Sequence, residues 1–334
     1  MDFTEFSTGK DDNGRRLDRV IRIFLSDKNL PEIYKLIRKG LIKLNHSKAK
    51  PETHVLQGDV ISIASFLLQN TENSSLCDSQ TQNSNSKNSL KIVFENQHLL
   101  IIDKPYDVTV HGEKDGLYKL VLDYYNSKKN KCTSLSFKPG PLHRLDRRTT
   151  GLLVFSMSLE GARYFTQEIK NHSISKKYYA LAQGDIQKNE LWNDFIKAQD
   201  SKNSLQNDSQ QGFKTVLAAS KALDSDYQNA ITAVTPLAKG SLNNRTVTLC
   251  EYSIKTGRKH QIRAQSALHG FPLAGDSAYG AQKLNNANRE FYLQAYSLSF
   301  PTDNPLEIPQ EIKINIAPDF LSQLECCGIK KSGL

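Results

Sequence analysis

The sequence predicts an α+β protein in which a small N-terminal module is joined by a polar linker to a larger, strand-rich domain with interspersed helices. First, the 334 residues suffice for about two domains of roughly 100–200 residues each. Second, helical and strand-like apolar spacings both occur, without the regular strand–helix repeat of a parallel sheet. Third, a polar tract separates an N-terminal block from the rest. We place the parts at 1–66, 67–89 (linker), 90–325 and 326–334 (tail).

The N-terminal module is predicted to contain two helices followed by two strands. Five apolar residues recur at helical spacing and give the first helix one buried face: Leu17, Val20, Ile21, Phe24 and Leu25. The second helix begins near Pro31, which suits a first helical turn, and ends at Gly40, a residue type common after helix C-termini. Short strands follow at 41–44 and 60–63, each next to turn residues.

Positive charge is concentrated in this module. The chain carries a formal net charge of +9, and residues 15–50 alone hold eleven lysines and arginines against three acidic residues. Such a dense patch favours a nucleic-acid surface, because phosphates attract clustered cations. The alternative is a solvated, charged helix face that binds nothing.

Two other tracts are too polar to bury a core. Residues 69–89 are mostly Asn, Ser, Gln and Thr, and we expect them to form a flexible linker. Residues 199–211 are predicted to be a surface loop of the larger domain. In that domain, periodicity predicts strands at 91–95, 99–103, 178–182 and 246–254, and helices around 117–124, 162–169 and 260–268.

The most informative stretch runs from His143 to Gly151 and ends where an apolar run begins at Leu152. One carboxylate, Asp146, stands among three arginines, so we expect it to be ionised and available as a nucleophile or an electrostatic anchor. A loop-to-strand junction also places it on a rigid element, as a reactive group requires. The pattern points to covalent chemistry on a polyanionic substrate.

Composition argues against several other classes. No apolar run approaches the ~20 residues that span a bilayer, and the acidic N-terminus lacks a secretory pattern, so we expect a cytoplasmic protein with no membrane partner. The five cysteines include no C-x-x-C pair, which favours reduced thiols. The eight histidines show no zinc-site spacing, and we find no glycine-rich phosphate loop.

The basic module resembles the S4 RNA-binding module. The resemblance rests on Arg16-Leu17-Asp18, on the block from Leu36 to Gly40, on Asn45, and on the block from Gly58 to Ile61. It implies that two helices present a basic face to structured RNA, where phosphate contacts supply affinity and positioning. The candidate RNA contacts in this module are Arg16, Arg19, Lys35, Arg38, Lys39 and Lys43.

The larger domain resembles the RluA-type pseudouridine synthases in four blocks that occur in the family's order. These blocks are 99–105 with Val110-His111, 143–153, 177–181, and 256–263 continuing to Gly275-Asp276 and Tyr279-Gly280. Thr150 departs from the pattern, because the family usually has Ser at this position. The resemblance, together with the S4-like module, covers most of the chain outside the polar tracts. It implies a catalytic domain built on a mixed, largely antiparallel central sheet.

The resemblance implies roles for particular side chains. Asp146 matches the family's catalytic aspartate, and Arg263 matches a basic residue that pairs with that carboxylate. Tyr178 matches a tyrosine that packs against the target base, while Tyr179 points to the other face of its strand. Arg144 matches the arginine that fills the base stack after the target is turned out. Further candidate RNA contacts are Lys104, His111, Arg258 and His260.

These residue types suit the conversion of uridine into its carbon-linked isomer. The target base must leave its stack, at a cost of a few kcal/mol, and a guanidinium can refill the gap. The reaction involves no redox step and no net transfer of atoms, so we expect no cofactor and no metal.

We therefore expect a monomeric, RluC-like pseudouridine synthase that acts on uridines of large-subunit (23S) ribosomal RNA and does not bind DNA. A near alternative is an RluD-like or tRNA-directed synthase. An alternative from another class is a non-catalytic RNA-binding factor of ribosome assembly. A carboxylate-dependent RNA hydrolase is disfavoured, because no second positioned acid or metal cluster accompanies Asp146.

Overall fold

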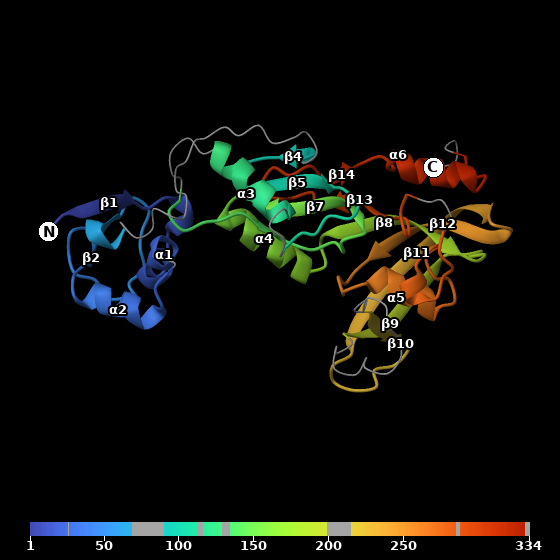
Figure 1. Cartoon of the computed structure of the whole chain (residues 1–334), viewed down its shortest axis with the longest axis horizontal. Helices are drawn as coiled ribbons and strands as arrows, with labels where there is room; N and C mark the ends of the chain where they lie inside the picture. The colour runs from blue at the N-terminus through green and yellow to red at the C-terminus, as the bar shows by residue number, and fades with distance from the viewer. Residues whose placement is uncertain are drawn as a thin grey trace. The chain divides into compact units, whose positions relative to one another are not determined.

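The computed structural model describes residues 1–25, 27–68, 90–111, 116–128, 134–198, 215–284 and 288–330 (Figure 1). The polar tracts 69–89 and 199–211, and the last four residues of the predicted tail, lie outside these ranges. The chain folds into two compact units. The first comprises Met1–Ser89, Lys119–Gly140 and Ser156–Ala162, and the second comprises Leu90–Tyr118, Pro141–Phe155 and Arg163–Leu334. The boundaries predicted from the sequence, at residues 66, 89 and 325, remain predictions.

The N-terminal module is a three-stranded antiparallel sheet with two helices packed beside it. The strands β1 (Phe3–Ser7), β3 (Val60–Ala64) and β2 (Ile42–Leu44) lie in that order, and the helices are α1 (Leu17–Phe24) and α2 (Leu30–Arg38). The predicted helices and the two later strands are confirmed. The strand β1 was not predicted, since its five residues alternate too briefly to give a clear signal.

Local sequence explains where α2 starts and stops. The side chain of Asn29 accepts the amide of Glu32, and the Glu32 carboxylate accepts the amide of Asn29, which closes a capping box. After the helix, Gly40 takes a φ of +72°, a left-handed conformation that glycine adopts at little cost. The apolar residues Ile33 and Ile37 face inward between these caps and are fully buried.

A buried carboxylate joins this module to a later segment of the same unit. Asp12 is 0% exposed and accepts hydrogen bonds from Ser134 and Ser136 and from the amides of Leu135 and Ser136. Burial alone would raise the pKa of Asp12, but these hydrogen bonds outweigh burial and lower it. Residues 134–136 therefore belong structurally with the N-terminal module, although they lie far along the chain.

The larger sheet has eleven strands among the described residues, in the order β10-β9-β11-β12-β8-β13-β7-β5-β4, with β14 beside β13 and β6 beside β7. Strands β7 and β13 run parallel, whereas the pairs from β10 across to β13 and the pair β4–β5 run antiparallel. This confirms the predicted mixed, largely antiparallel sheet. The strands are β4 (Ile92–Glu95), β5 (Leu99–Lys104), β6 (Gly140–Pro141), β7 (Thr150–Ser156), β8 (Ser175–Gln183), β9 (Glu190–Ala198), β10 (Val216–Ala219), β11 (Gln228–Leu242), β12 (Arg245–Ile254), β13 (Leu293–Ser299) and β14 (Glu311–Lys313).

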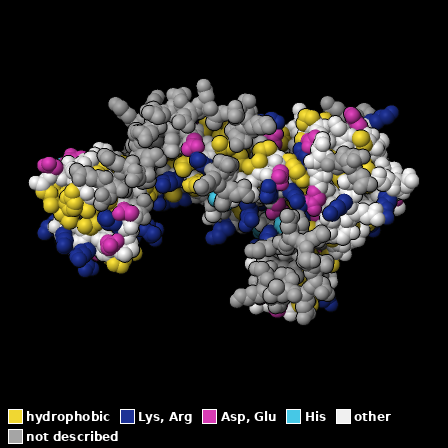
Figure 2. Space-filling model, viewed as in Figure 1, with side chains coloured by type: hydrophobic (Ala, Val, Ile, Leu, Met, Phe, Trp, Pro, Cys, Tyr) yellow, Lys and Arg dark blue, Asp and Glu magenta, His cyan; other side chains and the backbone are white. Residues whose placement is uncertain are grey.

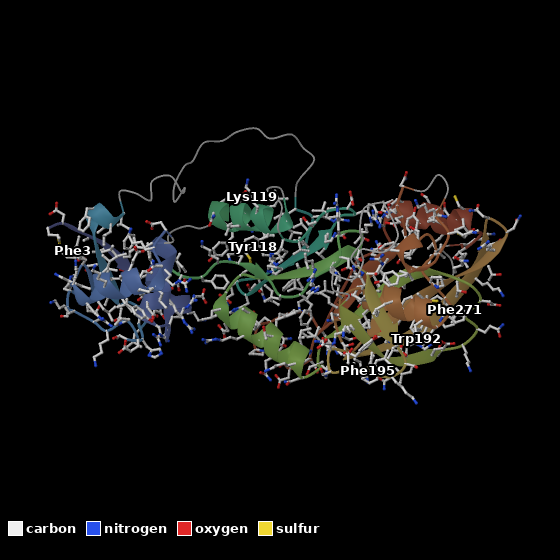
Figure 3. The ribbon with its side chains drawn as sticks, turned by 60° about the horizontal axis from the view of Figure 1, so that its bottom comes forward. Phe3, Tyr118, Lys119, Trp192, Phe195 and Phe271 are labelled. Atoms are coloured by element: carbon white, nitrogen blue, oxygen red, sulfur yellow. The ribbon has the colours of Figure 1, made fainter. Side chains whose placement is uncertain are left out.

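The helices α4 (Leu159–Lys170), α5 (Gln261–Leu268) and α6 (Pro318–Cys326) pack against this sheet (Figure 1). The helix α3 (Leu117–Lys128) falls mostly in the first unit. Phe165 of α4 packs against β5 and β7, and Phe320 of α6 packs against β8 and β12. Beside α5, Trp192 of β9 (labelled in Figure 3) stacks on His269 with ring centroids 4.6 Å apart. None of the helices in the described ranges has the length and apolar character that a membrane crossing requires.

Candidate active site

The loop that carries Asp146 lies between β6 and β7 and is fixed at both ends. Before Asp146, His143 Nε2 accepts the amide of Val154 at 3.2 Å. After it, β7 is buried along its whole length, and Gly151 has a φ of +107°. A Cβ at Gly151 would lie 2.1 Å from the carbonyl oxygen of Ala295 on β13, so only glycine fits this close approach. The loop therefore holds Asp146 on a rigid support.

Lys104 lies beneath this loop, at the end of β5. Its side chain is 0% exposed, and its Nζ donates to the carbonyl oxygens of Pro105 and Arg147, both at 2.9 Å. The prediction that Lys104 contacts RNA is therefore wrong, because a buried ammonium held by two carbonyls cannot reach a phosphate. Burial lowers the pKa of Lys104 to about 7, with the charges of Asp146 and Asp107 acting in the opposite direction. Lys104 instead fixes the backbone next to Asp146.

Burial and charge act against each other at Asp146, whose side chain is 20% exposed. Burial raises its pKa above the ordinary value, and the charges of Arg263, Arg144 and Lys259 oppose that shift without cancelling it. The sequence predicted an ionised carboxylate on the strength of the neighbouring arginines. The structure adds that the folded protein makes ionisation of Asp146 harder than in water, so the nearby cations are needed to offset burial.

Arg263 does not form the predicted direct pair with Asp146. Its Nε and Nη2 donate to Asp276 Oδ2 and Oδ1 at 2.6 and 2.7 Å, and the Asp276 side chain is 0% exposed. The guanidinium carbon also lies 4.9 Å and 4.5 Å from the ring centres of Tyr279 and Phe291. The geometry corrects the prediction, because Nε and Nη2 bind Asp276 and no hydrogen bond or ion pair joins Arg263 to Asp146 among the described residues. Arg263 acts on Asp146 at longer range, as the largest of the charges that oppose its pKa shift.

The alternation of β8 separates Tyr178 from Tyr179. Tyr178 is 6% exposed and lines the cavity that holds Asp146. Burial, and secondarily the charge of Asp146, raises the pKa of Tyr178, so its hydroxyl stays protonated at neutral pH. Tyr179 faces the opposite side and stacks on Tyr296 with centroids 3.7 Å apart. This arrangement agrees with the choice of Tyr178 as the site residue.

The cavity has a volume of about 350 Å³, within the range of pockets that hold small molecules and cofactors. It adjoins a second hollow of about 590 Å³ along the same loop. Asp146, Arg144 and His260 line both. The two hollows therefore have the Asp146 loop as a common wall.

Sequence reasoning missed Lys176, which lines the same cavity. Its side chain is 7% exposed, and no ion pair to it occurs among the residues that the structure describes. Burial lowers the pKa of Lys176 to about 8. Two adjacent lysines, Lys176 and Lys177, gave no local sign of which one is buried, and strand alternation is the signal that separates them.

The other predicted RNA contacts of this unit differ in accessibility. Arg144 is exposed at the rim of the cavity, and His111 is exposed and packs on Tyr118 (labelled in Figure 3) with centroids 5.7 Å apart. Arg258 is exposed, and its Nε donates to the carbonyl oxygen of Asn229 at 3.0 Å. These exposed side chains remain candidate RNA contacts.

His260 was predicted to begin a helix, and it precedes the first turn of α5 instead. Its backbone is left-handed, with φ of 53° and ψ of 22°. Such a conformation costs roughly 1–3 kcal/mol for a residue other than glycine and occurs more often at functional sites. Its side chain is 14% exposed, and its Nε2 lies 3.7 Å from Asp146 Oδ1. The fold therefore places the His260 ring next to the Asp146 carboxylate.

In the N-terminal module, most predicted contacts lie at the surface. Arg19, Lys35, Arg38 and Lys39 are exposed on α1 and just after or within α2. Figure 2 shows dark blue side chains gathered on this module. Arg16 is different, because its guanidinium forms a bidentate contact with Asp18, which also accepts the hydroxyl of Tyr34. Lys43 lies 4.3 Å from the ring centre of Phe3 and is half-buried.

The described residues contain no cluster of three or more His, Cys, Asp or Glu side chains arranged to hold a metal ion. What they contain is one carboxylate at a cavity, a protonated tyrosine hydroxyl beside it, and several cations around it. This set suits the binding of a polyanion and chemistry at one carboxylate.

Comparison with known proteins supports this interpretation. Residues 98–268 match the RNA pseudouridylate synthase family, and residues 15–61 match the S4 domain. The chain is 28% identical over 315 residues to the "Ribosomal large subunit pseudouridine synthase C" of Vibrio vulnificus, covering 88% of each chain. It is 30% identical over 277 residues to the protein of the same name from Buchnera aphidicola, covering 81% of this chain and 79% of that one.

Solved structures show the same fold. "Human RNA Pseudouridylate Synthase Domain Containing 1" superposes with a TM-score of 0.55 at 22% identity, over 74% of this chain and 90% of that one. "Human RNA Pseudouridylate Synthase Domain Containing 4" gives a TM-score of 0.55 at 19% identity, over 72% and 94%. At these identities the likeness concerns the fold alone.

Proposed function

Because the chain belongs to the RNA pseudouridylate synthase family, we propose that it isomerises particular uridines of large-subunit ribosomal RNA with Asp146 as the reactive carboxylate. It is a pseudouridine synthase, an isomerase. The observation that carries the proposed site is the cavity of about 350 Å³ that Asp146 lines together with Tyr178 and Arg263.

The proposed reaction needs one carboxylate and no outside reagent. The bond between uracil N1 and ribose C1′ breaks, the base turns, and a bond forms between uracil C5 and C1′. N1 ends with a proton, C5 loses one, and no atom is gained or lost overall. Asp146 would act at the nucleoside while Tyr178 packs against the base, and Arg144 would occupy the place that the base leaves in the stack.

The exposed cations explain how a structured RNA could be held. Arg144 and Arg258 border the cavity, and Lys35, Arg38 and Lys39 lie on the exposed side of the N-terminal module. Such side chains neutralise phosphates and fix the position of an RNA without reading much of its sequence. The choice of ribosomal RNA rests on the names of the two bacterial relatives and on the S4 match. A ribosomal substrate would place the enzyme in the cytoplasm.

A tritium-release assay tests the proposal. RNA carrying tritium at uracil C5 loses the label when C5 becomes the attachment point, so release by the purified protein without any methyl donor measures isomerisation. Transcripts of large-subunit rRNA and of tRNA are compared as substrates. We expect release from the rRNA, abolished in Asp146→Asn and unchanged in Asp123→Asn, an exposed carboxylate on α3. Release from tRNA alone would refute the ribosomal target, and undiminished release by Asp146→Asn would refute the role of Asp146.

A further inference from the structure

His260 makes a polar contact through each ring nitrogen, and the two contacts differ in kind. Nδ1 lies 2.9 Å from the hydroxyl oxygen of Tyr279, while Nε2 lies 3.7 Å from Asp146 Oδ1. One end of the ring is therefore hydrogen-bonded to a phenol and the other end faces the carboxylate. The histidine connects η4 (Ser277–Tyr279), which carries Tyr279, with the loop of Asp146.

The hydrogen-bond pattern at Tyr279 favours one of the two neutral tautomers of His260. The Tyr279 oxygen already accepts the backbone amide of Val216 on β10 at 3.0 Å. A phenol oxygen that already accepts one hydrogen bond donates its own hydrogen more readily than it accepts a second one, which favours the phenol as donor and Nδ1 as acceptor. In that arrangement the single N–H of the neutral imidazole is on Nε2, the nitrogen that faces Asp146.

Burial, more than the surrounding charges, keeps this ring neutral. Burial together with the cations Arg263, Lys259 and Arg144 lowers the pKa of His260 to about 3, with the charge of Asp276 acting in the opposite direction. Asp146 and Tyr279 also contact the ring, and the Tyr279 hydroxyl has a pKa raised to about 12, chiefly by burial. The hydroxyl therefore remains a donor throughout the working pH range.

We propose that His260 is a positioning residue that orients the Asp146 carboxylate through a neutral Nε2–H donor, and that the Tyr279 hydroxyl fixes this tautomer. The separation of 3.7 Å is longer than a hydrogen bond, and contacts of this kind tighten when the reacting complex forms. The donor stabilises the ionised carboxylate, whose pKa burial raises, without adding a charge that could draw it into an ion pair. The left-handed backbone of His260 agrees with this role, because such strained conformations occur more often at functional sites.

The inference rests on the proposed role of Asp146, and its first test does not require turnover. ¹⁵N-histidine NMR on the full chain reports the tautomer of His260, whose signals are identified by their loss in His260→Gln. We expect a neutral ring with the hydrogen on Nε2 from about pH 5 to 8, and a mixture of tautomers in Tyr279→Phe. A cationic ring at neutral pH, or a hydrogen on Nδ1, would overturn the proposal even if Asp146 is the reactive group.

Kinetics supply the second test, using two substitutions that differ in reach. His260→Gln keeps an amide donor near the place of Nε2, whereas His260→Asn tolerates the left-handed backbone but is too short to reach Asp146. We expect His260→Gln to remain within a few-fold of the wild-type kcat. We expect His260→Asn to lose about 100-fold in kcat, a typical loss for one fixed donor, with its acid limb moved to higher pH.

The KM for RNA separates this role from the predicted RNA contact of His260. We expect both variants to keep the wild-type KM and melting temperature. A raised KM with an unchanged kcat would make His260 an RNA contact, and equal losses in Gln and Asn variants with lowered melting temperatures would make it merely structural. If Asp146→Asn remained active while the NMR result held, the proposed function would fail and the tautomer assignment would stand.

Discussion

The buried pair of Arg263 and Asp276 gives the sharpest prediction about stability. Asp276→Asn leaves the guanidinium without a counter-charge in a site where the two side chains are only 7% and 0% exposed. Removing one partner of such a pair costs about 3–5 kcal/mol, against a total stability of about 5–15 kcal/mol for a typical domain. Two short charge-assisted hydrogen bonds, at 2.6 and 2.7 Å, also lose their ionised acceptor.

Calorimetry and denaturant unfolding measure this loss. At roughly 2–4 °C per kcal/mol for a domain of this size, Asp276→Asn should lower the melting temperature by about 6–20 °C. The double variant Arg263→Met/Asp276→Leu removes both charges and should recover much of that stability, because replacing a whole buried pair by apolar groups is often neutral. It should remain inactive, since Asp146 then lacks its largest opposing charge.

The result that would refute this reasoning is a cost below about 1 kcal/mol for Asp276→Asn, which is the range of an exposed pair. Asp319→Asn is a partial comparison, because Asp319 also binds an arginine in two places but is 30% exposed. It should cost less than Asp276→Asn. Equal costs at the two sites would show that burial does not set the magnitude.

Four further outcomes follow from the same contacts. Burial raises the pKa of Asp146, so its protonated form favours the folded state below the unfolded pKa of 3.8 and this advantage is lost as pH rises through the folded pKa. Asp146→Asn should therefore stabilise the fold at neutral pH but not near pH 4. The gain at neutral pH should be about 1.4 kcal/mol for each pH unit that separates the folded pKa from the unfolded one. An equal gain in melting temperature at both pH values would contradict this. Gly151→Ala should lower the free energy of unfolding, measured in urea, by more than ~3 kcal/mol because its Cβ would meet backbone at 2.1 Å. Gly58→Ala is the control, because Gly58 has a φ of +89° but open space around it, and it should cost about 1 kcal/mol. Burial lowers the pKa of Lys176 to about 8, so we expect the wild-type kcat/KM to fall at alkaline pH and Lys176→Arg to remove that fall; a wild-type profile that is flat up to about pH 9 would contradict a role for this charge. Replacing three exposed cations of the N-terminal module by Ala should lower the slope of log K against log salt for RNA binding by about 2–3; these are Lys35, Arg38 and Lys39. The same change at three exposed lysines elsewhere should leave the slope unaltered, and these are Lys188, Lys221 and Lys330. Equal slopes for the two triple variants would contradict the basic-patch account.

Local patterns were sufficient for much of the fold. The apolar spacing of α1, the capping residues of α2 and the turn at Gly58 are written within a few residues of each other, so sequence reasoning found these elements. The strands β9, β10 and β11 were missed, because their pairing depends on partners that are distant along the chain. The mixed sheet was expected from the family resemblance more than from periodicity.

The site residues, like the secondary-structure elements, divide into those that local sequence identified and those that depend on contacts distant along the chain. Asp146 and Tyr178 could be selected because the family's motifs surround them, and the structure places both at one cavity. The burial of Lys104 could not be foreseen, since a lysine is a surface residue unless distant carbonyl groups meet its ammonium. The partner of Arg263 was missed although Asp276 stood in a matched block, because nothing local indicates which of two carboxylates a guanidinium binds.

The most direct test of the central claim is a crystal structure with an RNA whose target uridine carries fluorine at C5. Fluorine cannot leave as a proton, so the reaction should stall with the nucleoside in place. The account predicts the altered pyrimidine inside the cavity, against Tyr178, with an Asp146 oxygen bonded to the nucleoside or within about 3–3.5 Å of it. A target nucleoside bound elsewhere, with Asp146 still out of its reach, would contradict the account.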